Sequence, residues 1–133
     1  MDYIFRLTYG TDLRKGIEDY CANNGISSGC IVSCVGCVYK AKLRMAGGEI
    51  INEYDKDFEI VSLVGTISED GVHMHISLSD VSGAVIGGHL VYGCLVNTTA
   101  EVVIRDLGYK YKLNREYDEK TLYNELVIKE DLK

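Results

Sequence analysis

Three histidines, His73, His75 and His89, are the residues of this chain whose types and spacing could do chemistry, and they are all the histidines it has. His73 and His75 are separated by one residue, so in an extended strand both side chains project from the same face, about 6–7 Å apart. His89 directly follows two glycines, Gly87 and Gly88. Neutral imidazole is the commonest nitrogen ligand of zinc. The pattern therefore predicts that the three side chains converge on zinc or a similar divalent metal.

Three protein nitrogens would leave the fourth position of a tetrahedral ion open, which is typical of catalytic rather than closed structural zinc. An ion held in this way lowers the pKa of its bound water towards about 7 and polarises a carbonyl or carboxylate. The alternative is that His73 and His75 line a polar surface between subunits, hydrogen-bonded to Ser77 or to a carboxylate. The sequence alone leaves both interpretations open.

Two carboxylates near the histidines in sequence could orient a ligating imidazole, namely Asp80 and Glu101. Asp80 is better explained as a turn residue that bonds its own backbone. Glu101 lies in an apolar segment and needs a partner, which Arg105 or Arg6 could supply. Arg6 is the only charge within its strand, and beside a metal it would favour an anionic ligand, although a strand-face ion pair explains it equally well.

Composition predicts one globular domain over residues 1–133, since 47% of the residues are hydrophobic and 26% are charged. The formal net charge of −6 argues against a nucleic-acid binder. The longest apolar runs fall short of the roughly 18 residues that span a bilayer. The first residues lack the pattern of a signal peptide, so we expect a cytoplasmic protein without a membrane partner.

The five cysteines form an odd set for a disulfide framework. Cys34 and Cys37 have the C-x-x-C spacing, but no second such pair completes a zinc ribbon. Because the segment around Cys34 is typical of a buried strand, we expect these cysteines to pack as small apolar residues.

Hydrophobic periodicity predicts one main helix near the N-terminus and about seven strands. The helix runs from about residue 13 to 23, with Thr11 or Asp12 as its cap and Asn24-Gly25 at its end. Gly87-Gly88 is interpreted as a bulge that positions His89. The expected strands are 2–9, 28–45, 58–67, 72–79, 85–90 leading into a long apolar strand 91–104, 109–113 and 123–128, the last closing the sheet. The fold class is α+β with a mainly antiparallel sheet.

These residues resemble the plant and prokaryote conserved (PPC) domain family from about Tyr3 to Ile128. The resemblance implies an α+β fold that assembles as a homotrimer. Plant members carry AT-hooks, and bacterial members are commonly labelled DNA-binding on that basis. This chain has no proline and no Arg-Gly-Arg, so it has no AT-hook, and direct DNA binding is doubtful. The matching segments are Phe5-Arg6-Leu7, Gly10-Thr11-Asp12-Leu13, Ser33-Cys34-Val35-Gly36, Gly65-Thr66-Ile67, Gly71 to Asp80, Gly83 and Gly87-Gly88-His89-Leu90.

The fold is also similar, more remotely, to that of acetolactate decarboxylase, whose zinc is held by an H-x-H pair and a later histidine. The matching positions here are His73, His75 and His89. A physical argument also favours a trimer. The apolar surface of the strand expected at 90–104 is larger than one helix can cover, so contacts between subunits would bury the rest.

Two function classes follow. The first is a trimeric binding or regulatory module whose three histidines hold a metal together with a small anionic ligand. The second is a metal-dependent lyase or hydrolase acting on a small carboxylated substrate. An enzyme would need a general acid or base near the open metal position, and none is unmistakable in the sequence, so whether the chain is an enzyme stays open. A third class, a DNA-associated module, is supported only by the DNA-binding label that members of the family carry.

Overall fold

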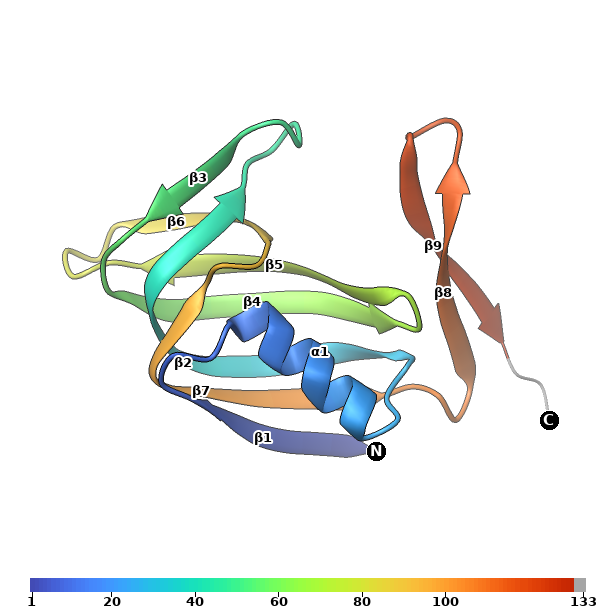
Figure 1. Cartoon of the computed structure of the whole chain (residues 1–133). Coiled ribbons are helices and arrows are strands. Elements are labelled where there is room, and N and C mark those ends of the chain that lie inside the picture. Colours follow the sequence, from blue (N-terminus) through green and yellow to red (C-terminus); the bar gives the residue numbers. More distant parts are fainter. Residues whose placement is uncertain (131–133) are drawn as a thin grey trace.

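The computed structural model describes residues 1–130, which contain one α-helix and two antiparallel sheets (Figure 1). The α+β class and the mainly antiparallel sheet predicted from the sequence are confirmed. In chain order the elements are β1 (Asp2–Thr8), α1 (Leu13–Asn23), β2 (Gly29–Arg44), β3 (Ile51–Tyr54), β4 (Phe58–Ser68), β5 (Gly71–Ser79), β6 (Val85–Leu90), β7 (Leu95–Asp106), β8 (Tyr111–Asp118) and β9 (Tyr123–Glu130).

The larger, seven-stranded sheet has the order β1-β7-β2-β4-β5-β6, with β3 paired to β2. Strand β2 is 16 residues long because its two parts pair with different partners. Near its end, Leu43 and Arg44 pair with Leu90 and His89 of β6. The path β2-β4-β5-β6 therefore returns to β2, and the end of β6 that carries His89 is held between β5 and β2.

Helix α1 covers one face of this sheet (Figure 1). Its N-terminus is capped by the carboxylate of Asp12, which accepts a hydrogen bond from the Lys15 amide at 2.9 Å. Leu13 and Ile17 are fully buried against the sheet, and Phe5 of β1 stacks on Tyr20 at 3.8 Å. The opposite, outer face of the sheet is left without a helix among the described residues.

The prediction of one long apolar strand over residues 91–104 is wrong, because β6 ends at Leu90 and β7 begins at Leu95. The chain turns at Gly93, whose φ of 117° suits glycine, and the Asp12 carboxylate accepts a hydrogen bond from the Gly93 amide at 2.6 Å. The apolar pattern extends across this turn because Leu90 before it and Cys94 after it are both fully buried. The short strand β3 was not predicted either.

The expectation that residues 123–128 close the main sheet is also wrong. Strand β9 pairs with β8 along its whole length, so the two form a separate hairpin that stands beside the sheet (Figure 1). The hairpin is attached through β8, where Leu113 is buried and its amide donates to the Ser28 hydroxyl at 3.0 Å. The Arg115 amide donates to the Asp70 carboxylate at 2.7 Å. The hairpin thus lies next to the β4–β5 turn. Strand β5, which carries His73 and His75, begins at this turn.

Cys34 packs as predicted, whereas Cys37, the other member of the C-x-x-C pair, is only half-buried. Cys21, Cys34 and Cys94 are buried, and none of the five forms a disulfide. Burial raises the pKa of the Cys34 thiol to about 12, so it stays protonated at neutral pH. No helix within residues 1–130 is long and apolar enough to cross a membrane.

Candidate metal centre

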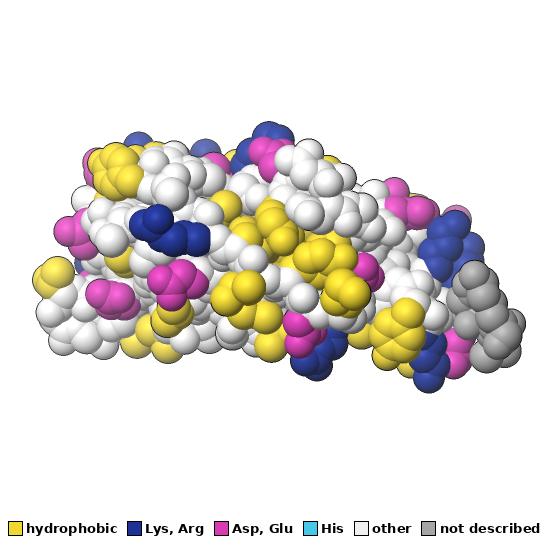
Figure 2. All heavy atoms as spheres, turned by 90° about the horizontal axis from the view of Figure 1, so that it is seen from below, with side chains coloured by type: hydrophobic (Ala, Val, Ile, Leu, Met, Phe, Trp, Pro, Cys, Tyr) yellow, Lys and Arg dark blue, Asp and Glu magenta, His cyan; other side chains and the backbone are white. Residues whose placement is uncertain are grey.

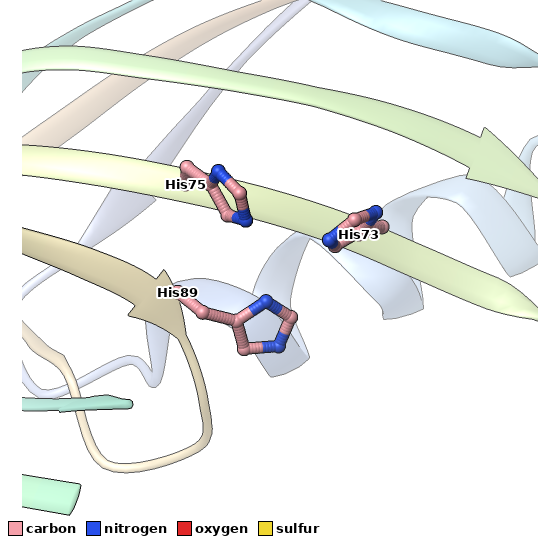
Figure 3. A group of neighbouring side chains, drawn as sticks. All are labelled: His73, His75 and His89. Atoms are coloured by element: carbon pink, nitrogen blue, oxygen red, sulfur yellow. The ribbon is translucent and has the colours of Figure 1, made fainter. Parts of the chain in front are cut away.

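The three histidines meet on the outer face of the sheet (Figure 3). His75 of β5 and His89 of β6 are directly opposite each other, and paired residues project from the same face. His73 lies two positions along β5, so it shares that face. The ring centroids are 5.0 Å apart for His73 and His75, 5.2 Å for His73 and His89, and 5.6 Å for His75 and His89. One ring nitrogen of each lies within 4.8 Å of the others.

This donor set fits a tetrahedral divalent ion. Zinc bound at 2.0–2.1 Å holds its nitrogen ligands roughly 3.3 Å apart, so small side-chain rotations complete the site. The buried Nδ1 atom of His89 has no hydrogen-bond partner within the described residues. A buried polar atom without a partner is costly, and a bound ion or its water would satisfy it. His73 and His75 are exposed, and a cavity borders His73 and His89, so the remaining position of an ion would be accessible to a small molecule.

Gly87 and Gly88 position His89, but not through a bulge, because the β5–β6 register runs unbroken through both residues. A Cβ atom on Gly87 would lie 2.7 Å from the Ile76 carbonyl oxygen, and one on Gly88 would lie 2.8 Å from the Arg44 carbonyl oxygen. The bulge interpretation is therefore wrong. Glycine is required because β6 is inserted closely between β5 and β2.

The surroundings of His89 and His73 favour the neutral form of these two rings. Burial, assisted by the nearby Arg44 charge, lowers the pKa of His89 to about 4. Burial and then the Arg115 charge lower the pKa of His73. Both rings are therefore uncharged at pH 7 and keep a lone pair for a metal.

The lowered pKa of His89 makes the stability of the metal-free protein depend on pH. The unfolded chain protonates this residue near its ordinary pKa of 6.5, whereas the folded chain resists protonation until about pH 4. The stabilisation is therefore complete above pH 6.5 and is lost as the pH falls towards 4. We expect the urea midpoint in EDTA to fall between pH 7 and pH 5, and to fall less in His89→Gln. Equal losses in parent and variant would contradict this assignment.

The other charged residues considered from the sequence do not join the histidines. The Asp80 carboxylate accepts hydrogen bonds from the amides of Ser82 and Ala84, as expected of a turn residue, and pairs with Lys56. Arg6 donates to the Thr99 hydroxyl at 2.9 Å.

Glu101 lies on β7, opposite Arg6 of β1, and strands β2 and β4 separate β7 from the histidine strand β5. Arg105 pairs with Asp2 instead of Glu101. Arg6, Glu101 and Arg105 therefore lie near the opposite edge of the sheet from the histidines.

Several polar residues that the sequence analysis missed lie around the histidines instead. A cavity of about 500 Å³ borders His73 and His89. Arg44 lies next to His89 because β2 pairs with β6. The residues of the β8–β9 hairpin lie near β5 because of where the hairpin packs against the sheet. In the sequence, Arg44 looks like part of a solvated strand face. The other polar residues lining the cavity are Arg14, Asp70, Arg115, Tyr123, Asn124 and Glu125.

Arg14 of α1 ties the two histidine strands together. Its guanidinium donates to the Leu90 carbonyl at 3.0 Å and to the Val72 carbonyl at 3.4 Å, while Glu18 pairs with it at 3.0 Å. Leu90 follows His89 and Val72 precedes His73. Arg14 is therefore a positioning residue for the cluster.

Arg14→Gln is expected to weaken zinc binding about tenfold, the scale found for residues that orient metal ligands. Zinc competition against a chromophoric chelator measures this change. The neighbouring Lys15→Gln is the control, because Lys15 pairs with Asp19 on the surface and, within residues 1–130, its side chain makes no hydrogen bond or ion pair with either histidine strand. Equal affinities for the two variants would show that Arg14 does not position the histidines.

Fold and donor set together define a small α+β protein with an open group of three histidines on the outer face of its sheet. Residues 1–108 match the model of the Plants and Prokaryotes Conserved (PCC) domain. The chain belongs to this family, which is the PPC family named above.

Known proteins of this kind are similar over nearly the whole chain. The Bifunctional protein GlmU of Synechococcus sp. (strain JA-3-3Ab) is 37% identical over 126 residues, which are 95% of this chain but only 20% of that protein. The chain thus spans about a fifth of the length of the curated relatives it matches.

Three solved structures have similar folds. A hypothetical protein from Salmonella cholerae-suis has a TM-score of 0.94 and 32% identity, covering 99% of this chain and 95% of its own. A Bacteroides thetaiotaomicron protein provisionally described as DNA-binding has a TM-score of 0.85 and 25% identity, with coverage of 95% and 91%. A protein from Archaeoglobus fulgidus called metal-containing has a TM-score of 0.81 and 28% identity, with coverage of 96% and 93%.

Proposed function

We propose that this protein is a trimeric PPC-domain binding module that holds one divalent metal ion, preferably zinc, through His73, His75 and His89. The observation that carries the proposal is the convergence of three ligand nitrogens within 4.8 Å, one ring having a buried Nδ1 without a partner. The name of the Archaeoglobus fulgidus structure as a metal-containing protein supports it. Such an ion would polarise a ligand oxygen at its open position.

The homotrimer is supported by the apolar character of the outer face. Cys30 pairs with Thr66 and Cys37 with Glu59, and this register brings Val32 level with Val64 and Val35 level with Val61. These four valines are exposed, together with Ile4 of β1. Seen from below (Figure 2), the surface shows hydrophobic side chains gathered at its centre, on a side from which no histidine is visible. Apolar groups gathered in this way are typical of a subunit interface. Because Val64 is opposite His75, the proposed interface reaches the metal centre.

The proposal includes a cytoplasmic location, where five free thiols stay reduced. It does not include direct DNA binding, because the net charge of −6 opposes the approach of a polyanion.

One observation favours the second candidate function, a metal-dependent lyase or hydrolase acting on a small carboxylated molecule. Glu125 of β9 borders the same cavity as His73 and His89, and its negative charge partly opposes the lowering of the His73 pKa by burial and Arg115. A carboxylate in that position could accept or deliver a proton at a bound molecule. Glu125→Gln would then abolish turnover without loss of the metal.

The experiment that tests the proposed function is zinc titration of the chelator-stripped, tag-free protein, followed by elemental analysis after gel filtration. We expect about one zinc per chain and a particle of three chains. Less than a tenth of an ion per chain would overturn the metal site, and a single-chain particle would overturn the trimer.

A further inference from the structure

We propose that two arginines, Arg44 and Arg115, form a carboxylate-binding subsite next to the histidines, so that the module takes a small carboxylic acid with a second oxygen donor. The inference rests on the proposed function, because the second donor would bind the metal. Its evidence is the strand register, the hydrogen bonds of the two guanidinium groups and the cavity that they border.

Arg44 flanks the histidines on the β2 side. His89 is paired with His75 on one side and with Arg44 on the other, so the three side chains form one row on the same face. Arg44 borders the 500 Å³ cavity together with His73 and His89. Its positive charge also contributes to the lowered pKa of both histidines, which agrees with this proximity.

Arg115 flanks the cluster on the opposite side. Its guanidinium donates to the Thr66 hydroxyl at 3.2 Å, and Thr66 is paired directly with His73. Arg115 comes from β8, so the separate hairpin brings this charge to the histidines. Two guanidinium groups therefore lie on either side of the three imidazoles.

The two groups retain donors for a ligand. Within residues 1–130, the Arg44 side chain makes no hydrogen bond or ion pair, although it is half-buried. Arg115 uses its side chain for the single bond to Thr66. Arg14 differs, because Glu18 and two carbonyl groups occupy it. A half-buried cation without a partner favours the binding of an anion.

The chemistry of the cavity favours a carboxylate over a phosphate. A planar guanidinium matches a carboxylate with two parallel hydrogen bonds. Asp70 and Glu125 also line the cavity, and their charges penalise a phosphate, which concentrates its negative charge on one group, more than two singly charged carboxylates held apart at the two arginines. A cavity of about 500 Å³ admits a small molecule. A 2-hydroxy dicarboxylate such as malate has the required groups, namely a carboxylate for each arginine and a hydroxyl for the ion.

The test measures binding of three probes, malate, succinamide and inorganic phosphate, to the cobalt-loaded and the metal-free protein by calorimetry. The visible spectrum of the cobalt form is the second readout. We expect malate to shift the spectrum, and Arg44→Gln and Arg115→Gln each to weaken malate binding about tenfold or more while the cobalt Kd changes less than about threefold. Lys42→Gln is the matched control, since Lys42 lies on the same strand but pairs with Glu53.

The failures are distinguishable. Unchanged malate binding in both arginine variants, or equal binding of malate and neutral succinamide, would overturn the carboxylate subsite and leave the metal site standing. Tighter binding of phosphate than of malate would overturn the claim that the subsite prefers a carboxylate. If cobalt does not bind at all, the proposed function fails. Malate binding to the metal-free protein then decides the subsite, because it must still weaken in Arg44→Gln.

Discussion

His75→Ala is expected to weaken zinc binding by at least about a hundredfold. His75 connects the other two ligands through the sheet, because it is paired with His89 and lies two residues from His73 on the same strand. Removing it leaves two imidazoles, which hold zinc much more weakly than three do. The substitution leaves the core intact, since His75 is exposed and the residues that pack beneath the cluster, Met74 and Ile76, are unchanged.

Competition against a chromophoric chelator measures this loss, and circular dichroism in EDTA checks that parent and variant fold alike. The control is Cys37→Ser, which removes a half-buried thiol of the C-x-x-C pair, the other group of soft ligands in the chain. We expect the control to bind zinc as the parent does. A weakened Cys37→Ser together with an unaffected His75→Ala would move the metal site to the cysteines.

Val35→Asp is expected to convert the trimer to single chains. Val35 and Val61 lie level on β2 and β4 and are 59% and 56% exposed, on the face opposite α1. If neighbouring chains cover this face, an aspartate at residue 35 is buried without a partner in every interface. The free-energy cost of burying this charge recurs in each interface of the trimer. It exceeds the free energy that a small interface gains from its apolar contacts. Within one chain the same change is mild, because the side chain is exposed.

Size-exclusion chromatography with light scattering gives the mass of the particle at micromolar concentration. Val81→Asp serves as the control, because Val81 lies in the turn after β5, 94% exposed and away from the sheet face. We expect three chains for the parent and the control and one chain for Val35→Asp. A single-chain parent, or a Val35→Asp variant that still contains three chains, would refute the proposed interface.

The elements with clear periodicity were predictable from the sequence. Alternation in β1 and the Asp12 cap of α1 are local signals, and the structure confirms both. The break at Gly93 was not predictable, because it depends on a hydrogen bond from its amide to Asp12, far away in the sequence. The pairing of β9 was missed for a similar reason, since an alternating strand does not specify which edge it joins.

The three histidines of the candidate site were predictable from the sequence, whereas the arginines next to them were not. The H-x-H spacing alone places two imidazoles on one face. Register then brings His89 opposite His75, and the unbroken pairing explains Gly87 and Gly88 as points of close strand approach. Arg44 and Arg115 could not be associated with the histidines, because one depends on the return of β6 to β2 and the other on the position of a hairpin. Arg6, which the sequence allowed either as a basic neighbour of the metal or as part of a strand-face ion pair, lies on β1, at the edge of the sheet farthest from β5 and β6.

Anomalous diffraction at the zinc edge, from crystals of the zinc-loaded protein, tests the central claim most directly. We expect one strong peak per chain, at 2.0–2.1 Å from one ring nitrogen of each of His73, His75 and His89. A peak bound by cysteines or carboxylates elsewhere, or a zinc-loaded crystal in which the three rings hold no peak, would contradict it.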